Sequence, residues 1–332
     1  MSHPENVPRL LRWLNKAAQK GWIRFDQYSP LKRLAIVFYI VWKGLWRPMW
    51  RVTHPWKALW ALLTGKDTYR LSLPGYAPQS LQMSPLNFLN FLRLYEAGYT
   101  PVAIDADKNV LIIEMAPGVR YTAHVTDTAD LVHLKELLLE QEYGVSFRGY
   151  WILDVGGYRG ETALFFCAHG AEKVIVAEPA PDNYALARQN IQQSPYQDRI
   201  ELLPVGIADK SGTLSLRFDL RHPHVHSLDH LHGSPSEGAP TVSVEVWSFQ
   251  QLVEHSGWPE IDLVKLDCEG AEYPILLNTP PEVLRRVRRW AIEYHGSPTP
   301  LQDRLRELGY AVRLVRDRGA FGILHAERQQ SA

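Results

Sequence analysis

Residues 261 to 272, Ile-Asp-Leu-Val-Lys-Leu-Asp-Cys-Glu-Gly-Ala-Glu, constrain the fold more than any other stretch of the chain. An apolar run suited to the protein core ends abruptly in Asp267, Glu269 and Glu272. Burying an unpaired carboxylate is costly, so acids at the end of a core strand need a partner. In an open α/β sheet, ligands bind outside the carboxyl ends of the strands. This stretch therefore predicts a core strand that ends in a binding or reaction site.

Strands and helices alternate from residue 150 onward, which predicts a mostly parallel sheet with helices on both faces. The predicted strands are 151–155, 173–177, 200–206, 261–266 and 289–295. The predicted helices are 160–169, 181–193, 248–256 and 300–308. Two last strands, 311–315 and 321–325, flank Arg-Asp-Arg-Gly and are expected to form a closing antiparallel hairpin. The fold class expected for this part is therefore α/β.

A glycine turn follows the first of these strands. Asp154 stands near the strand end, and Gly156, Gly157 and Gly160 follow it. Glycines in such a turn let the backbone approach a ligand closely. Their spacing differs from the dinucleotide fingerprint Gly-x-Gly-x-x-Gly, and Asp154 would repel a pyrophosphate. An acid there suits a cofactor that carries an amine or a positive group, such as S-adenosylmethionine.

Two further acids follow the next strands. Glu178, followed by Pro179, ends the second strand 18 residues beyond Gly160. An acid in this place can accept hydrogen bonds from ribose hydroxyls, although it could also be a helix-start acid favoured by the helix dipole. Asp209, after Ala208, is expected either to contact the adenine amino group or to be a simple turn acid.

Four motifs together resemble those of the FkbM-type S-adenosylmethionine-dependent methyltransferases, over residues 150–296. They are Asp-Val-Gly-Gly-x-x-Gly, Ala-Glu-Pro, Asp-Leu-Val-Lys-Leu-Asp-Cys-Glu-Gly-Ala-Glu and Ile-Glu-Tyr-His. The resemblance implies a class I methyltransferase (Rossmann-like) fold, with a seven-stranded sheet whose last strand is antiparallel. It also implies S-adenosylmethionine as cofactor and, usually, O-methylation of sugars or other hydroxyl-bearing natural products.

The cofactor-binding residues expected on these grounds are Asp154, Gly156, Gly157, Tyr158, Gly160, Glu178, Pro179, Ala208, Asp209 and Asp267. One position departs from the pattern, because family members usually have Ala-Asn where this chain has Gly157-Tyr158. The bulkier tyrosine either reshapes the methionine end of the cofactor pocket or points outward. In the first case the chain could be a methyltransferase-like scaffold that methylates nothing.

The predicted reaction centre combines the ends of two strands that neighbour each other in this fold. Alternation along the second strand places Glu293 and His295 on one face, next to Asp267. Histidine suits a general base at neutral pH, so we expect His295 to take the hydroxyl proton, with Asp267 or Glu269 as its partner. The alternatives are Asp267 as the base, or a divalent metal on Asp267, Glu269 and Glu293. We therefore predict no metal site. The histidine-rich loop 220–240 also lacks the spacing of a zinc site.

The N-terminal part differs in charge from the rest of the chain. Residues 1–66 hold twelve Lys/Arg and two Asp/Glu, a net of +10, so the remainder holds 24 and 34, a net of −10. The first 60 residues also hold seven of the eleven tryptophans. We therefore expect three parts: a basic, tryptophan-rich helical extension (1–66), a small α+β region (67–149) and the methyltransferase domain (150–332).

The partners follow from these features. Segment 31–63 has no apolar run of about 20 residues, so it does not span a bilayer as a helix. Its tryptophans beside Lys/Arg suit peripheral contact with a membrane interface, or else packing on the main domain or on a second copy in a homo-oligomer. A nucleic-acid partner is not expected, because the catalytic part is acidic. The expected acceptor is a hydroxyl-bearing small molecule or glycan, with N- or C-methylation as the alternative. Two cysteines in apolar segments indicate a cytoplasmic protein, one that could lie at the inner face of the membrane.

Overall fold

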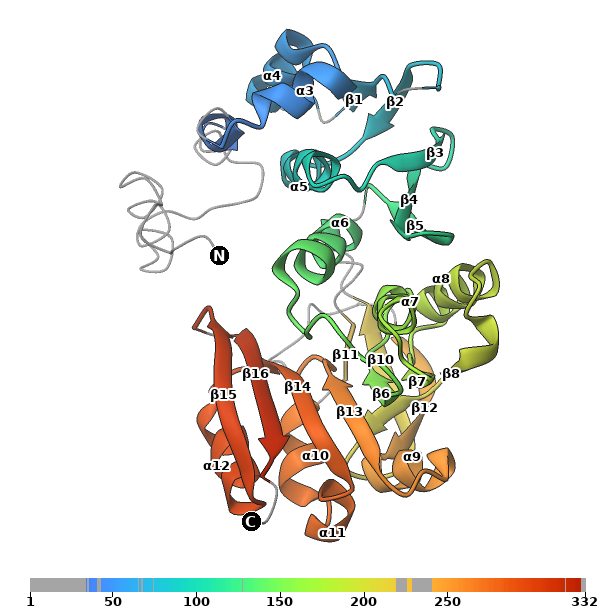
Figure 1. The fold of residues 1–332 in the computed structure, drawn as a ribbon, viewed down its shortest axis with the longest axis vertical. Coiled ribbons are helices and arrows are strands. Elements are labelled where there is room, and N and C mark those ends of the chain that lie inside the picture. The colour runs from blue at the N-terminus through green and yellow to red at the C-terminus, as the bar shows by residue number, and fades with distance from the viewer. Residues whose placement is uncertain are drawn as a thin grey trace. The chain divides into compact units, whose positions relative to one another are not determined.

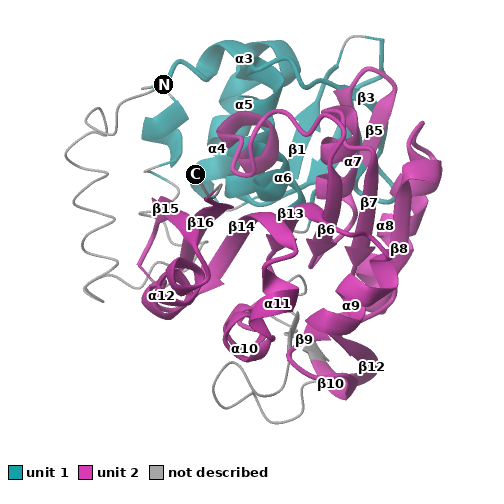
Figure 2. Ribbon diagram, turned by 60° about the horizontal axis from the view of Figure 1, so that its bottom comes forward, with its two compact units in different colours: residues 1–113, 122–135 teal, residues 114–121, 136–332 magenta. Residues whose placement is uncertain are grey.

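The computed structural model describes residues 34–329, apart from 35, 41–42, 65, 67, 74, 127, 219–225, 229–240 and 320. The chain divides into two compact units, coloured separately in Figure 2. Unit 1 comprises residues 1–113 and 122–135, and unit 2 comprises residues 114–121 and 136–332. The boundaries expected from composition, after residues 66 and 149, stay a prediction.

Unit 1 is a small α+β structure. Its elements are α3 (Trp46–Val52), α4 (Pro55–Thr64), β1 (Thr68–Leu71), β2 (Gln79–Gln82), α5 (Pro85–Glu96), β3 (Pro101–Asp105) and α6 (Thr128–Lys135). The antiparallel strands β4 (Val110–Ala116) and β5 (Val119–His124) are divided between the units, because residues 114–121 belong to unit 2. Helix α5 begins where the hydroxyl of Ser84 accepts from the backbone N–H of Asn87, an N-cap bond. The ring of Tyr69 stacks on Phe88, with centroids 4.1 Å apart, in the core of this unit.

Unit 2 carries the alternating part of the chain (Figure 1). Its first half consists of η2 (Glu136–Glu140), β6 (Trp151–Val155), α7 (Glu161–Ala168), β7 (Lys173–Ala177), α8 (Pro181–Gln192), η3 (Gln197–Arg199), β8 (Ile200–Leu203), β9 (Gly206–Ala208), β10 (Gly212–Phe218), β11 (His226–Leu228) and β12 (Thr241–Ser248). Its second half consists of α9 (Phe249–Ser256), β13 (Ile261–Leu266), α10 (Glu272–Asn278), α11 (Pro281–Leu284), β14 (Val287–His295), α12 (Thr299–Glu307), β15 (Tyr310–Asp317) and β16 (Phe321–Arg328).

The main sheet of unit 2 has seven strands in the order β15-β16-β14-β13-β6-β7-β8. Every pairing from β14 to β8 is parallel, and β16 is antiparallel to both of its neighbours. The strand order reverses between β6 and β13, the kind of switch point where ligands bind in open α/β sheets. This is the predicted class I methyltransferase arrangement, with its antiparallel last strand.

The two faces of this sheet differ in character. One face packs its strand residues on α9, α10 and α12, and Trp290, Phe249 and Ile275 are fully buried there. The other face carries Asp154, Lys265 and the other polar strand residues, in register with one another. Helix α7 lies against β7, and α8 lies beside β8. Both faces bury apolar side chains, Ile152 and Val176 among them on the face beside α7, but that face also carries the polar groups.

The prediction of one strand over 200–206 is wrong. β8 ends at Leu203, and β9 begins at Gly206 in a second sheet of order β11-β10-β12-β9. Pro204 lies between them and has no backbone N–H to donate to a ladder. The chain therefore changes sheets at this proline, and Ala208 ends a strand of the second sheet.

We predict that Gly156→Ala destabilises unit 2. Gly156 has φ +79°, and a Cβ there would lie 1.7 Å from the backbone oxygen of Asp267. Left-handed strain and overpacking together should lower the free energy of unfolding by at least about 2 kcal/mol. Urea unfolding measures this. In the control Gly212→Ala, the new Cβ meets nothing within 4 Å; an equal loss in both variants would contradict the explanation.

Candidate active site

The glycine loop after β6 is held so closely that two of its glycines have no room for a side chain. Besides the contact at Gly156, a Cβ on Gly157 would lie 2.0 Å from Cγ1 of Val176 in β7. Gly160 has φ +84° and is the N-cap of α7. The loop thus lies beside the carboxyl ends of β6, β7 and β13, and its close approach to them requires glycine.

Tyr158 occupies a backbone conformation that bulky residues rarely adopt. Its φ is +45°, in the left-handed region where asparagine is tolerated better than tyrosine. Its side chain is buried, and the guanidinium carbon of Arg159 lies 4.7 Å from the ring centroid. The backbone N–H of Tyr158 donates to Oε2 of Glu178 at 2.9 Å. The tyrosine therefore adds backbone strain while the loop keeps its bond to Glu178.

Glu178 is the first residue after β7, and it is buried. Its Oε1 accepts from the backbone N–H of Ala180 at 2.8 Å, in addition to the bond from Tyr158. Burial raises the pKa of Glu178 to about 7, and these two N–H groups oppose the rise. A carboxylate has about four acceptor positions, so Glu178 retains capacity to accept from a ribose hydroxyl. Its predicted ribose contact stays a prediction.

A buried ammonium group joins the central strands. Nζ of Lys265 lies 3.3 Å from Oδ1 of Asp154 and 3.6 Å from Oδ2 of Asp267, and it donates to the backbone oxygen of Gly156. The hydroxyl of Thr162 donates to Oδ2 of Asp154. Burial alone would lower the pKa of Lys265, but the carboxylates of Asp154 and Asp267 raise it well above its usual value. Asp154 is therefore engaged inside the protein, and its contact with a cofactor amine stays a prediction.

The predicted adenine side lies at the ends of β7 and β9. A Cβ on Gly206 would lie 3.6 Å from Cβ of Pro179, so these two segments adjoin. Ala208 is buried, and Oδ2 of Asp209 accepts from the side-chain amide of Asn278 in α10 at 2.9 Å. Asp209 is thus tied to α10, and its adenine contact stays a prediction.

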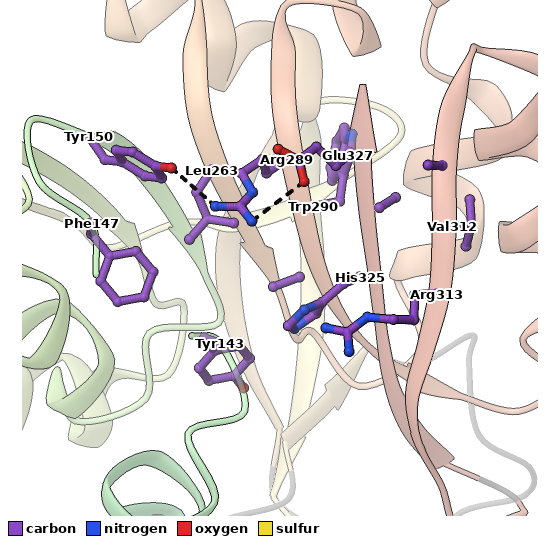
Figure 3. Close-up of a pocket in the computed structure, with 13 residues that line it drawn as sticks. Tyr143, Phe147, Tyr150, Leu263, Arg289, Trp290, Val312, Arg313, His325 and Glu327 are labelled. Carbon is purple, nitrogen blue, oxygen red and sulfur yellow. Dashed lines mark hydrogen bonds and ion pairs between the residues drawn. The ribbon is translucent and has the colours of Figure 1, made fainter. Parts of the chain in front are cut away.

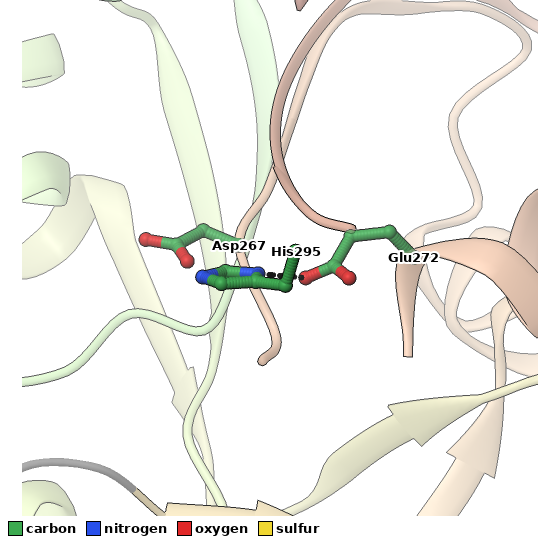
Figure 4. Close-up of side chains that lie close together, drawn as sticks. All are labelled: Asp267, Glu272 and His295. Atoms are coloured by element: carbon green, nitrogen blue, oxygen red, sulfur yellow. Dashed lines mark hydrogen bonds and ion pairs between the residues drawn. The ribbon is translucent and has the colours of Figure 1, made fainter. Parts of the chain in front are cut away.

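His295, at the end of β14, lies between carboxylates (Figure 4). Its Nδ1 donates to Oε1 of Glu272 at 3.3 Å, and its Nε2 lies 3.5 Å from Oε2 of Glu269. Burial alone would lower the pKa of His295, but the hydrogen bond and charge of Glu272, with Asp267 and Glu269, raise it to about 10. His295 is therefore an imidazolium at neutral pH. That charge state does not favour its predicted role as general base, since a protonated ring cannot accept a proton.

Two further carboxyl groups, those of Asp267 and Glu293, stand at or near the ends of β13 and β14. Burial, and then the charge of Asp267, raise the pKa of Glu293 to about 8. The side chain of Asp267 is 26% exposed and pairs with Lys265. A carboxylic acid that stays protonated at neutral pH can donate a hydrogen bond, and the partly exposed carboxyl group of Asp267 has oxygen atoms that can accept one. The ends of β13 and β14 therefore bring together one donor, one acceptor and one cation.

The sequence patterns did not predict a group of functional residues in the segment before β6. Burial, and then the charges of Asp267 and Glu293, raise the pKa of Tyr143 well above its usual value. Glu142 is buried and accepts from Arg316 near the end of β15. Burial, and then the charge of Glu136, raise the pKa of Glu142 to about 7. The acids at 136, 140 and 142 outnumber the one lysine beside them, Lys135, and were a signal for a distant cationic partner.

Two groups of side chains among the described residues have donor atoms close enough to hold a metal ion: Asp267 with Glu272 and His295, and Glu136 with Glu140 and Glu142. In the first group, Glu272 already accepts from the backbone N–H groups of Cys268 and Gly270, each at 2.8 Å. In the second group, Arg316 pairs with all three acids and Arg318 pairs with Glu136 and Glu140. The predicted histidine-rich loop lies outside the described residues, except for the backbone of β11.

A cavity of about 250 Å³ opens on the polar face of the sheet, nearer the amino ends of β13 and β14 (Figure 3). Its lining includes Tyr143, Phe147, Tyr150, Arg289, Arg313 and His325. Arg289 donates to the hydroxyl of Tyr150 at 3.1 Å and lies 3.6 Å from Glu327. None of the predicted site residues lines this cavity, and Tyr143 is the residue that links it to the charges of the reaction centre.

Comparison with known proteins agrees with this arrangement. The model of the FkbM methyltransferase domain matches residues 154–319, half of the chain. The chain belongs to the FkbM methyltransferase family. It is a methyltransferase by family, and the cofactor of the family is S-adenosylmethionine, as the sequence predicts. No curated protein shows a match to the sequence.

Solved structures show weaker similarity. The FkbM methyltransferase from Methylobacillus flagellatus KT has 15% identity and a TM-score of 0.37, over 60% of this chain and 54% of that one. The N-terminal domain of human METTL16, solved in complex with SAH, has 14% identity and a TM-score of 0.37, over 74% and 83%. TrmK of M. capricolum has 12% identity and a TM-score of 0.35, over 58% and 68%. This chain thus spans about half the length of the Methylobacillus protein.

The residues present fit S-adenosylmethionine. The glycine loop leaves backbone rather than side chains at the ends of β6 and β7. Glu178 lies beside this loop with acceptor capacity, and Asp267 is the partly exposed carboxylate at the end of β13. The cofactor supplies a methyl group on a sulfonium centre, and a carboxylate-rich site suits that positive charge.

We predict that Glu178→Ala weakens cofactor binding. Loss of hydrogen bonds to a charged acceptor should cost about 1.5–3 kcal/mol, a rise in Kd of roughly 10- to 150-fold. Calorimetric titration with S-adenosylmethionine and S-adenosylhomocysteine measures this. Glu172→Ala, at the exposed opposite end of β7, is the matched control. An unchanged Kd in Glu178→Ala would exclude the ribose role.

We also predict a pH-dependent contribution of His295 to stability. Its folded pKa of about 10 lies above the value of 6.5 for a free histidine. The contribution is therefore fully present below pH 6.5 and is lost as the pH rises through 10. The difference in free energy of unfolding between the wild type and His295→Gln should be largest near the acidic end of this window and vanish at its alkaline end.

Urea unfolding at several pH values across that window measures the difference. The control is His255→Gln, because His255 pairs with Glu201 at 2.8 Å on the surface and exposed ion pairs contribute little. A wild-type-to-His295→Gln difference that does not vary with pH would contradict the assigned charge state.

Proposed function

We propose that the protein is an S-adenosylmethionine-dependent O-methyltransferase that acts on a hydroxyl of a glycan, glycolipid or similar natural product. One observation carries the proposal: Asp267, Glu293 and His295 lie together at the carboxyl ends of neighbouring strands. Methyl transfer to oxygen needs an acceptor for the hydroxyl proton and groups that hold the hydroxyl in place. This set of side chains offers both.

The charge states assign different tasks to these three residues. Asp267 is the partly exposed carboxylate, so it takes the proton from the acceptor hydroxyl. Glu293 has a pKa of about 8, so it is protonated at neutral pH and donates a hydrogen bond to an oxygen of the methyl acceptor. The imidazolium of His295, held by Glu272 and Glu269, stabilises the negative charge that develops on the acceptor oxygen as its proton leaves. Asp267 as the base was the alternative to His295 in the sequence analysis, and it suits these charges better.

Lys265 holds Asp267 in position from inside the protein. Its ammonium group bonds to Asp154, Asp267 and the backbone of Gly156. The carboxylate that takes the proton is thereby linked to the loop that contacts the cofactor. A small displacement of reacting groups lowers rate strongly, so we assign Lys265 a positioning role.

The proposal is tested by methyl transfer from labelled S-adenosylmethionine to a panel of hydroxylated acceptors, including glycans and glycolipids. An alkali-stable methyl ether on one acceptor class is the expected product. A methylated amine would instead identify an N-methyltransferase, since amines need little proton removal. Tight cofactor binding without product on any acceptor, or no binding at all, would favour the scaffold reading and overturn the proposal.

We predict that Asp267→Asn lowers kcat by roughly 10²- to 10⁴-fold, the usual contribution of general-base catalysis. The Kd for S-adenosylhomocysteine should change much less, because the amide still fills the position. The matched control is Asp262→Asn, near the start of the same strand, where the carboxylate pairs with Arg288 at 2.7 Å. A kcat for Asp267→Asn close to that of the control would exclude Asp267 as the base.

A further inference from the structure

The helices α3 and α4 each bury one side and expose a pair of tryptophans four residues apart. Met49 and Val52 are buried in α3, while Trp46 and Trp50 are 45% and 57% exposed. Ala58, Ala61 and Leu62 are buried in α4, while Trp56 and Trp60 are 68% and 63% exposed. Residues at i and i+4 share one side of a helix. Each helix therefore presents an aromatic side to its surroundings.

Basic residues accompany these tryptophans. Arg47 and Arg51 follow Trp46 and Trp50 directly, Lys57 follows Trp56, and all three basic residues are exposed. The guanidinium carbon of Arg47 lies 5.6 Å from the ring centroid of Trp46. The sequence has no Asp or Glu between residues 27 and 66. We call these seven residues, Trp46, Trp50, Trp56, Trp60, Arg47, Arg51 and Lys57, the tryptophan-basic face.

Exposed apolar surface of this kind marks an interaction site in a monomeric protein. A second copy of the chain is a poor occupant, because a two-fold contact would set the same basic residues opposite one another. An anionic bilayer suits both the exposed tryptophans and the basic residues of the face. Tryptophan rings lie at the headgroup level of a bilayer, and basic residues near an anionic surface are attracted to it.

We propose that the tryptophan-basic face docks on the surface of an anionic lipid bilayer. Among the described residues, no helix is long and apolar enough to cross a membrane. The contact is therefore peripheral, with the rings at the headgroup level and the basic side chains among the phosphates. The proposal rests on the α3 and α4 side chains alone and is independent of the methyl-transfer chemistry.

The experiment is co-sedimentation of the full chain with phosphatidylcholine vesicles, with and without phosphatidylserine. The wild type should sediment with the anionic vesicles, and salt should weaken this binding. The double variant Trp56→Ala/Trp60→Ala should lower the partition coefficient on the order of tenfold or more. Arg47→Gln/Arg51→Gln should lower binding to the anionic vesicles alone.

The matched controls are Tyr76→Ala and Lys108→Gln, an exposed aromatic and an exposed basic residue of unit 1 outside this face. Both should bind vesicles as the wild type does.

Should a tryptophan variant fail to fold by circular dichroism, quenching of wild-type tryptophan fluorescence by brominated lipid gives the same information without a mutation. Absence of vesicle binding, or equal binding by the tryptophan variant, would overturn the proposal. The proposal would also be overturned if self-association of the chain, or binding of single-stranded RNA, took the tryptophans away from the vesicles. Cofactor titration of the same samples separates these outcomes from a failure of the active site.

Discussion

The buried ammonium group of Lys265 is the interaction on which the rest of the site depends. A charge removed from water costs several kcal/mol unless it is paired and hydrogen-bonded. Here the partners are Asp154 on β6, Asp267 after β13 and the backbone oxygen of Gly156. The same loop presses Gly156 against the backbone of Asp267. The cofactor loop and the proposed base therefore share one rigid framework, which neither strand could provide alone.

Much of the main sheet could be predicted because its strands end in chemically distinct residues. The strands at 151–155, 173–177 and 261–266 have the predicted bounds, since each is an apolar run that stops at an acid or glycine. The strand at 200–206 was not predictable in this way. Its apolar residues continue past Pro204, and the change of sheet depends on the parallel pairing of β9 with β12, forty residues later in the chain.

The positions of the site residues were easier to predict than their charges. Alternation on one strand sets Glu293 and His295 on the same side, but it says nothing about protonation. That is decided by burial and by distant groups, namely Glu272 at the start of α10 and the acids before β6. Glu272 illustrates the difference. It accepts two backbone N–H groups at the start of α10, and it also holds the proton on His295.

The opposite net charges of the two ends of the chain decide which part of it meets the membrane in the proposed contact. Residues 1–66 carry a net of +10 and the remaining residues a net of −10. An anionic surface attracts the first and repels the second, and both effects act within about a Debye length of 10 Å. The basic segment can therefore meet lipid while the acidic methyltransferase part stays free of it. This preference of the anionic surface for residues 1–66 needs no fixed arrangement of the two units, because it follows from the charges alone.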